Sequence, residues 1–211
     1  ILAERLEKRT VDHIRLFVKA EPHKIKKIEQ KRWRLISSVS VVDQIIDQML
    51  FGDMNDEMVK AWFFSPLKVG WSPYCGGWKV VPRRGLAIDK TAWDWTAKLW
   101  LFAMDLEVRA GLLKPGPHVE LWKELAAWRY RMLFENPTFV TSGGLILRQL
   151  KKGFMKSGCV NTLMSNSLMQ YLLHLRVCYT LRIPVGWFWA MGDDTYQELP
   201  AEARSYLDLL S

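Results

Sequence analysis

The strongest constraint on the fold is the stretch "IPVGWFWAMGDDTYQ" at residues 183–197, where an apolar and aromatic run stops at a glycine and two adjacent aspartates. The run predicts a buried strand, Gly192 permits a tight turn, and the residues after Asp194 predict a returning strand. Glycine and aspartate favour turns for backbone reasons alone, so a solvated turn is the simplest interpretation. The alternative is a divalent-metal site, where the ion offsets the repulsion between the carboxylates of Asp193 and Asp194.

The composition indicates a folded protein with an anionic partner. The 211 residues are 49% hydrophobic and include 11 tryptophans, which is enough to bury a substantial core. Three widely spaced cysteines suggest neither a disulfide framework nor a zinc cluster, and they fit a reducing compartment. The net charge of +8 makes nucleic acid and an anionic membrane surface the candidate partners.

No apolar stretch approaches the roughly 20 residues needed to cross a bilayer, so we expect no transmembrane segment. The N-terminal residues also lack the apolar core of a signal peptide. The first residue is Ile1 rather than methionine, and residues 204–211 resemble the middle of a helix. We therefore expect the chain to be an excerpt of a longer polypeptide.

Residues 19–34 form a basic strip, with seven Lys or Arg against two Glu. The strip is predicted to be extended or looped, and apolar residues at helical spacing after it predict a helix. A charge run is most often a solvated surface. Its position beside the β-prone "WRLISSVSVV" favours the alternative, a phosphate-binding segment.

A short apolar strand is predicted at residues 86–88, directly before Asp89, whose carboxylate a rigid sheet can aim. Helices are predicted at residues 96–110 and 119–136, followed by a strand or hairpin after Pro137. Four tryptophans beside these segments are interpreted as core residues: Trp93, Trp95, Trp187 and Trp189.

Residues 156–177 predict a helix with two different faces. Thr162 and Asn166 lie four residues apart, so they share one face near the helix N-terminus, while Met164 and Leu168 begin an apolar face. Polar residues near a helix start usually serve as caps, and this simple interpretation stands for the segment taken alone.

Taken together, these segments resemble motifs A, B and C of the viral RNA-dependent RNA polymerases. Motif A is Asp89 with Asp94 five residues later, and motif C is Gly192-Asp193-Asp194. Motif B has the form S-G-x3-T-x3-N-S, which a random chain of this length matches with a chance well under about one in a thousand. Its residues are Ser157, Gly158, Thr162, Asn166 and Ser167.

The basic strip resembles motif F of the same family, with Lys19, Lys27 and Arg34 at its nucleotide-contacting positions. His23 stands where many members have arginine. Within the family, the chain is most similar to sobemovirus-like positive-strand RNA viruses. The family's motif D usually offers a lysine as general acid, and no lysine follows Lys156 here.

The resemblance implies an α+β fold: a right-hand polymerase palm, with an antiparallel sheet backed by helices, with partial fingers and without a thumb. Residues 1–82 would form the first part of the fingers, with motif F, and residues 83–111 the palm with motif A. Residues 112–152 would complete the fingers. Residues 153–211 would be palm with motifs B and C, ending within motif D.

The resemblance also implies RNA-directed RNA synthesis by two Mg²⁺ ions, for which Mn²⁺ is a substitute. Two-metal sites hold their ions roughly 3.5–4 Å apart, which requires carboxylates from different segments to converge. Asp89 and Asp193 are the expected main ligands, and Asp194 supports the second ion. Asp94 and Asn166, with Ser157 as a further candidate, would bind the ribose 2′-hydroxyl, and Gly158 and Thr162 complete the substrate-binding set.

Expected partners are template and nascent RNA, ribonucleoside triphosphates and viral replication proteins. The expected location is the host cytoplasm, at membrane-associated replication complexes reached through other regions or partners. Reverse transcriptases share the palm but place a bulky aromatic near the position of Asp94, which makes them a less favoured reading. A non-catalytic RNA-binding or degenerate polymerase fragment remains the alternative.

Overall fold

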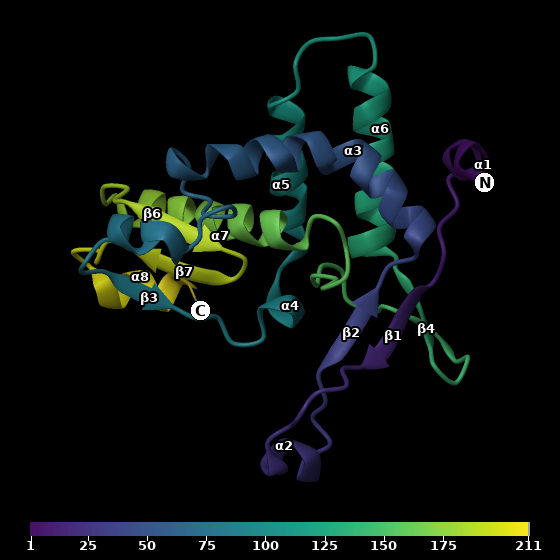
Figure 1. Cartoon of the computed structure of the whole chain (residues 1–211), viewed down its shortest axis with the longest axis horizontal. Helices are drawn as coiled ribbons and strands as arrows, with labels where there is room; N and C mark the ends of the chain where they lie inside the picture. Colours follow the sequence, from purple (N-terminus) through teal and green to yellow (C-terminus); the bar gives the residue numbers. More distant parts are fainter. Residues whose placement is uncertain (211) are drawn as a thin grey trace.

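The computed structural model describes residues 1–210, which form a mixed α+β protein with two separate sheets (Figure 1). The helical elements are α1 (Leu2–Lys8), α2 (Ile25–Glu29), α3 (Val41–Lys60), η1 (Ala61–Phe63), η2 (Tyr74–Val80), α4 (Trp93–Thr96), α5 (Leu99–Gly111), α6 (Val119–Tyr130), η3 (Arg131–Glu135), α7 (Thr162–Leu181) and α8 (Ala203–Leu210). The strands are β1 (Ile14–Val18), β2 (Leu35–Ser38), β3 (Leu86–Ile88), β4 (Thr138–Thr141), β5 (Ile146–Arg148), β6 (Phe188–Met191) and β7 (Asp194–Gln197).

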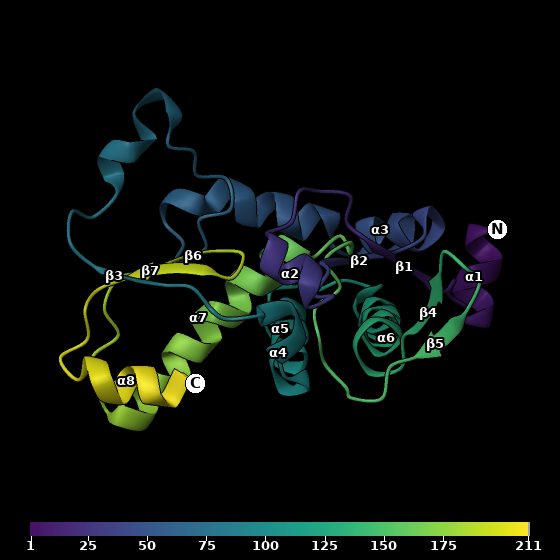
Figure 2. The ribbon, with the colours of Figure 1, turned by 90° about the horizontal axis from the view of Figure 1, so that it is seen from below.

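The smaller sheet has the order β3-β7-β6, and both of its pairings are antiparallel. Helices α7 and α8 lie on one side of it, and the segment between η1 and β3 loops over the other side (Figure 2). Phe188 and Ala190 are buried on β6, and a core of Val177, Cys178 and Tyr206 fills the space at α7 and α8. This side of the sheet is therefore closed.

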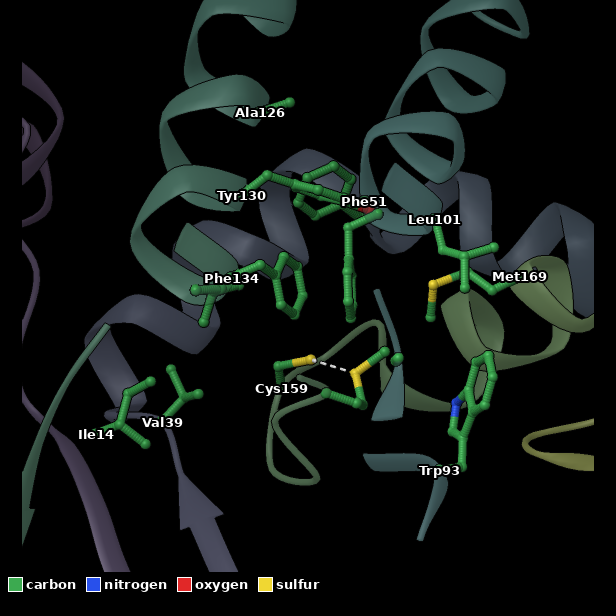
Figure 3. Packing of buried hydrophobic residues seen from close by; sticks show 14 residues of the cluster. Ile14, Val39, Phe51, Trp93, Leu101, Ala126, Tyr130, Phe134, Cys159 and Met169 are labelled. Atoms are coloured by element: carbon green, nitrogen blue, oxygen red, sulfur yellow. Dashed lines mark hydrogen bonds between the residues drawn. The ribbon is translucent and has the colours of Figure 1, made fainter. Parts of the chain in front are cut away.

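The larger sheet has the order β2-β1-β4-β5, with a parallel pair between β1 and β4 and antiparallel pairs elsewhere. Next to it, α3, α5 and α6 enclose the main hydrophobic core (Figure 3). Phe102 stacks on Phe134 with ring centroids 4.0 Å apart, and Phe51 meets Tyr130 edge-on at 5.7 Å.

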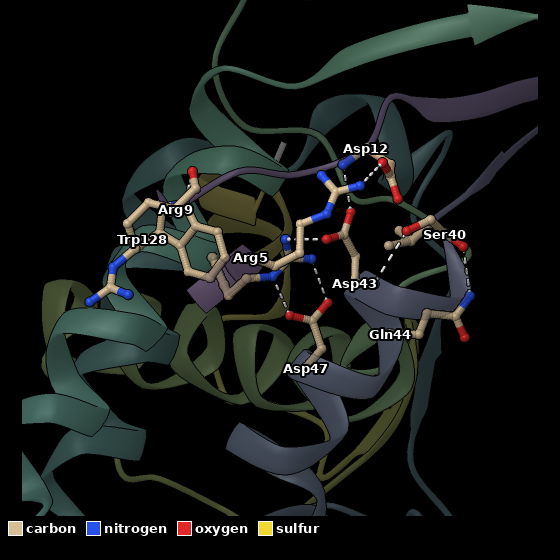
Figure 4. A network of polar contacts seen from close by, with 10 residues as sticks. Arg5, Arg9, Asp12, Ser40, Asp43, Gln44, Asp47 and Trp128 are labelled. Carbon is tan, nitrogen blue, oxygen red and sulfur yellow. Dashed lines mark hydrogen bonds and ion pairs between the residues drawn. The ribbon is translucent and has the colours of Figure 1, made fainter. Parts of the chain in front are cut away.

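Buried ion pairs connect these helices (Figure 4). Arg129 of α6 donates two hydrogen bonds to Asp47 of α3, at 2.5 and 2.9 Å, and lies 3.5 Å from Asp43. Asp43 also accepts the backbone N–H of Asp12, which pairs with Arg5. Because a buried charge is costly unless it is paired, these contacts fix α3, α6 and the N-terminal segment together.

The structure confirms the α+β class and corrects details of the sequence predictions. The helix expected at residues 96–110 is α5, which begins at Leu99 and follows the separate single-turn helix α4, and the second expected helix ends in the π-helical turn η3. Trp93 is buried, but Trp95 is 56% exposed because α4 is a single turn. Cys159 and Cys178 are buried, whereas Cys75 is exposed. None of the helices in residues 1–210 is long and apolar enough to cross a bilayer.

The buried His174 generates a prediction about pH. Its Nδ1 shares a hydrogen bond with the Tyr206 hydroxyl at 2.7 Å, and burial lowers the pKa of the imidazole from its usual 6.5 to about 4. The unfolded chain therefore binds a proton that the folded chain does not. The contribution of neutral His174 to the free energy of unfolding is complete above pH 6.5 and is lost as the pH falls toward 4.

We expect the urea midpoint of the wild type to fall between pH 7 and pH 5, and to fall less in His174→Gln. Unfolding curves followed by circular dichroism measure this difference. The exposed His13 supplies a matched control, since His13→Gln should keep the wild-type slope. Equal slopes for His174→Gln and the wild type would contradict the prediction.

Candidate active site

The hairpin between β6 and β7 carries the two adjacent aspartates. Met191 pairs with Asp194, so Gly192 and Asp193 are the two turn residues. Gly192 has a φ of 68°, in the left-handed region that glycine tolerates best. Its N–H donates to Ser167 Oγ at 2.8 Å, and this fully buried hydroxyl in turn donates to the Leu163 carbonyl at 2.8 Å. Helix α7 therefore fixes the position of the turn.

Asp89 follows β3 at the same end of the smaller sheet. The last pair between the antiparallel strands β3 and β7 is Ile88 with Thr195, so Asp89, one residue after Ile88, lies opposite Asp194, one residue before Thr195. Adjacent strands lie about 4.8 Å apart, which brings these two carboxylates close to each other and to the turn. Asp89 and Asp194 are exposed, and Asp193 is partly buried.

The pKa of Lys90 is influenced by two of these carboxylates. Burial lowers the pKa of Lys90 to about 8, while the charges of Asp193 and Asp89 act in the opposite direction. Both carboxylates thus lie within electrostatic reach of one ammonium group. Within residues 1–210, no group of three or more His, Cys, Asp and Glu side chains is arranged to hold a metal ion. The donors at this end of the sheet are carboxylate oxygens, the ligand type that Mg²⁺ prefers.

Asp94 and Asn166 are brought together by a tryptophan. Asp94 lies on α4 next to Trp93, whose Nε1 donates to Asn166 Oδ1 at 2.9 Å. This bond fixes the buried amide of Asn166 on α7. The pKa of Asp94 is raised, chiefly by burial and then by the charge of Asp193, whereas Arg34 and Lys156 lower it. Asp94 therefore lies within electrostatic reach of the Asp193 carboxylate and of two cationic side chains.

The loop before α7 packs closely on β2. Gly158 forms a parallel bridge with Ser38, and a Cβ atom at Gly158 would lie 2.3 Å from the Ser37 carbonyl oxygen. Only glycine permits this approach. Thr162 Oγ1 donates to the carbonyls of Lys156 and Cys159, both at 2.8 Å. The Thr162 hydroxyl proton is thus used inside the loop, while the N-cap of α7 is Asn161, which makes no side-chain capping bond.

The basic strip forms a hairpin of β1 and β2 that projects from the molecule with α2 at its far end (Figure 1). At the end of the strands that leads to α2, Glu21 pairs with Lys19 at 2.7 Å and with Arg34 at 3.2 Å, and the hydrogen bond from Lys19 is the largest cause of the lowered pKa of Glu21. Lys27 lies on the exposed α2. The structure therefore groups Lys19 with Arg34 and places Lys27 apart from them.

His23, which departs from the motif F pattern, lies in the same hairpin. Its Nδ1 is 2.7 Å from the Glu21 carbonyl oxygen, and its ring packs against Trp33 with centroids 5.4 Å apart. These contacts give His23 a structural place beside α2, at the far end of the hairpin.

Three residues with clear roles at the site were missed or underestimated in the sequence. The sequence identifies Ser167 only as the last position of motif B, and Trp93 only as an aromatic residue of the core. The sequence gives Lys156 no role, although it directly precedes Ser157; its charge does not single it out, because Lys151 and Lys152 lie in the same segment. That position was the one available signal.

Comparison with known proteins agrees with this geometry. The family model of viral RNA-dependent RNA polymerases matches residues 4–196. The chain is 37% identical over 205 residues to the replicase polyprotein P2AB of cocksfoot mottle virus, an alignment that covers 92% of this chain and 21% of the relative. It is 34% identical over 229 residues to protein P1-P2 of pea enation mosaic virus-1, covering 94% of this chain and 18% of the relative.

The replicase polyprotein P2AB of southern cowpea mosaic virus is 33% identical over 216 residues, covering 95% of this chain and 21% of that protein. The chain thus spans about a fifth of the length of these curated relatives. The match over most of the chain confirms the resemblance seen in motifs A, B and C: the chain belongs to the viral RNA-dependent RNA polymerase family.

Proposed function

We propose that this chain is the nucleotidyl-transfer core of an RNA-directed RNA polymerase that copies a viral RNA genome. The observation that carries the proposal is the common location of Asp89, Asp193 and Asp194 at one end of an antiparallel sheet, next to Asp94. Family membership supports the same activity.

Asp89, Asp193 and Asp194 would hold two Mg²⁺ ions, with Mn²⁺ as a substitute. The residues fit such ions because all three are oxygen donors, and two of them are open to solvent. When bound, the ions would activate the 3′-hydroxyl nucleophile and stabilise the charge that develops on the phosphates.

The chain's own residues would select and orient the ribonucleotide. The Asp94 carboxylate can accept a hydrogen bond from the ribose 2′-hydroxyl, and the Asn166 amide can donate one to it. This assignment is supported by the hydrogen bond from Trp93 Nε1 to Asn166 Oδ1, because that bond uses the amide oxygen and leaves the amide N–H groups available to a ligand. Ser157 and Gly158, packed against β2, would border the same position.

Lys19 and Arg34 would bind the triphosphate from the α2-side ends of β1 and β2, and Lys27 from its exposed helix. Arginine can bind phosphate with two parallel hydrogen bonds, whereas lysine acts as a point charge. Arg34 is near enough to Asp94 to influence its pKa, which supports a place beside the sugar and phosphates.

The remaining assignments are also proposals. Residues 1–82 and 112–152 would be fingers, and residues 83–111 and 153–211 palm. Partners would be template and nascent RNA, ribonucleoside triphosphates and viral replication proteins. The site of action would be membrane-associated replication complexes in the host cytoplasm.

The decisive test is Asp193→Asn in the complete viral protein that carries this chain. Loss of a metal-binding carboxylate should reduce Mg²⁺-dependent incorporation of labelled ribonucleotide by about 100-fold or more, because electrostatic stabilisation is worth several kcal/mol. The exposed Asp53 on α3 gives the matched control, Asp53→Asn, which should retain activity. Template binding without any incorporation by the wild type would instead favour the non-catalytic RNA-binding alternative.

The role of Asp94 predicts a change in sugar selectivity. Asp94→Ala should retain some synthesis but accept deoxyribonucleotides at least about tenfold better relative to ribonucleotides, since a tenfold change corresponds to about 1.4 kcal/mol. Primer extension with each substrate alone measures this ratio. An unchanged preference for ribonucleotides would remove Asp94 from the sugar site.

The basic strip predicts an effect on substrate binding. Arg34→Gln together with Lys27→Gln should raise the KM for ribonucleotides roughly tenfold, because a charge-assisted hydrogen bond contributes about 1.5–3 kcal/mol. Steady-state kinetics check this, with the exposed Lys8→Gln as control. If KM stays at the wild-type value, the strip is a solvated surface.

A further inference from the structure

Lys156 is a buried cation that the proposed chemistry does not use. Its side chain is 2% exposed, and no carboxylate pairs with it directly among the described residues. Instead Nζ donates to the Phe154 carbonyl at 2.8 Å, the Gly153 carbonyl at 3.2 Å and Gln149 Oε1 at 2.8 Å. All three ammonium protons therefore have neutral acceptors within one short loop.

The loop that Lys156 holds is conformationally demanding. Gly153 has a φ of 97°, and a Cβ atom there would lie 2.7 Å from the Ala97 carbonyl oxygen. Phe154 has a φ of 65°, a left-handed conformation that costs a side-chain-bearing residue about 1–2 kcal/mol. The hydrogen bonds from Lys156 to both carbonyls offset this cost.

The same loop is attached to the element that carries Asp94. The N–H of Phe154 donates to the Ala97 carbonyl at 3.1 Å, and the N–H of Met155 donates to the Asp94 carbonyl at 2.9 Å. These bonds join the loop to both ends of α4. A change in the loop would therefore move the backbone of Asp94.

The backbone of Lys156 organises the other side of the site. Its carbonyl accepts the N–H of Cys159 at 3.0 Å and Oγ1 of Thr162 at 2.8 Å. Lys156 thus connects α4 with the loop of Ser157 at the start of α7.

A cavity of about 220 Å³ lies beside this junction, between the larger sheet and α4. Asp94, Lys156, Ser157 and Ser37 line it, together with Phe139 and Trp95. Its volume leaves room for the loop to shift or for water to enter if the ammonium is removed. Close packing alone does not hold the loop, so the Lys156 hydrogen bonds are needed.

We propose that Lys156 is a positioning residue that sets the distance between Asp94 and the Ser157–Asn166 side of the ribose site. The inference rests on the proposed function, because it assumes that Asp94 reads the sugar. Burial lowers the pKa of Lys156 to about 7, with Cys159 and Asp94 acting in the opposite direction, so the ammonium form with all three donors predominates only below that pH.

The first test is Lys156→Met, which keeps much of the side-chain volume and removes the donors. We expect the KM for ribonucleotides to rise about tenfold, with a smaller change for deoxyribonucleotides and in kcat, because only the ribose contacts lose their geometry. Lys152→Met, at an exposed neighbour in the same loop, should behave as wild type. An equal rise in KM for ribonucleotides and deoxyribonucleotides, which leaves the selectivity unchanged, would overturn the proposal.

The double variant Lys156→Met/Asp94→Ala separates this proposal from the ribose assignment. If Lys156 acts through Asp94, the double variant should have the selectivity of Asp94→Ala alone. Additive losses would overturn the proposal. If Asp94→Ala itself keeps full selectivity, the ribose assignment fails instead.

Hydrogen exchange supplies a readout that does not depend on activity. In Lys156→Met the amides of Phe154 and Met155 should exchange at least about tenfold faster, while those inside α7 stay protected. Gln149→Leu removes one of the three acceptors of Lys156 and should raise the exchange rates of the same two amides by a smaller factor. This variant provides the measurement if Lys156→Met does not fold. Unchanged exchange at both amides would also overturn the proposal.

Discussion

The site depends on one buried carboxylate, that of Asp105. It is fully buried and accepts hydrogen bonds from Arg109 at 3.1 Å, Tyr130 at 2.5 Å and Ser165 at 2.6 Å. Removing a carboxylate from water costs several kcal/mol unless its oxygens are paired. Since the donors come from α5, α6 and α7, these helices must stay together. Burial, followed by the charge of Asp105, raises the pKa of Tyr130 well above its usual value and keeps its hydroxyl protonated as a donor.

Helix α7 connects this hydrogen-bond network to the site, because Ser165, Asn166 and Ser167 point in three directions about 100° apart. Ser165 contacts the Asp105 network, Asn166 meets Trp93 beside Asp94, and Ser167 holds the turn of Gly192. One rigid helix thus relates the helical core, the Trp93–Asn166 pair beside Asp94 and the carboxylates. Within the S-G-x3-T-x3-N-S motif, Gly158 makes the close contact with β2, Asn166 meets Trp93, and Ser167 holds the turn.

The sequence predicted the local elements well and the long-range contacts poorly. Periodicity and turn chemistry identified the hairpin at Gly192, the strand before Asp89 and the two-faced helix α7. The missed contacts join residues far apart in the chain, such as Trp93 to Asn166 or Gly192 to Ser167, and no local pattern marks them. The spacing of basic residues likewise could not show that β1 and β2 bring Lys19 to Arg34 while α2 carries Lys27 away.

The placement of the three thiols has a practical consequence. Burial raises the pKa of Cys159 to about 11 and also raises that of Cys178, so neither forms the reactive thiolate at neutral pH. Cys75 lies open to solvent in η2. A maleimide dye should therefore attach at a single position without mutagenesis, which makes the native chain suited to fluorescence labelling.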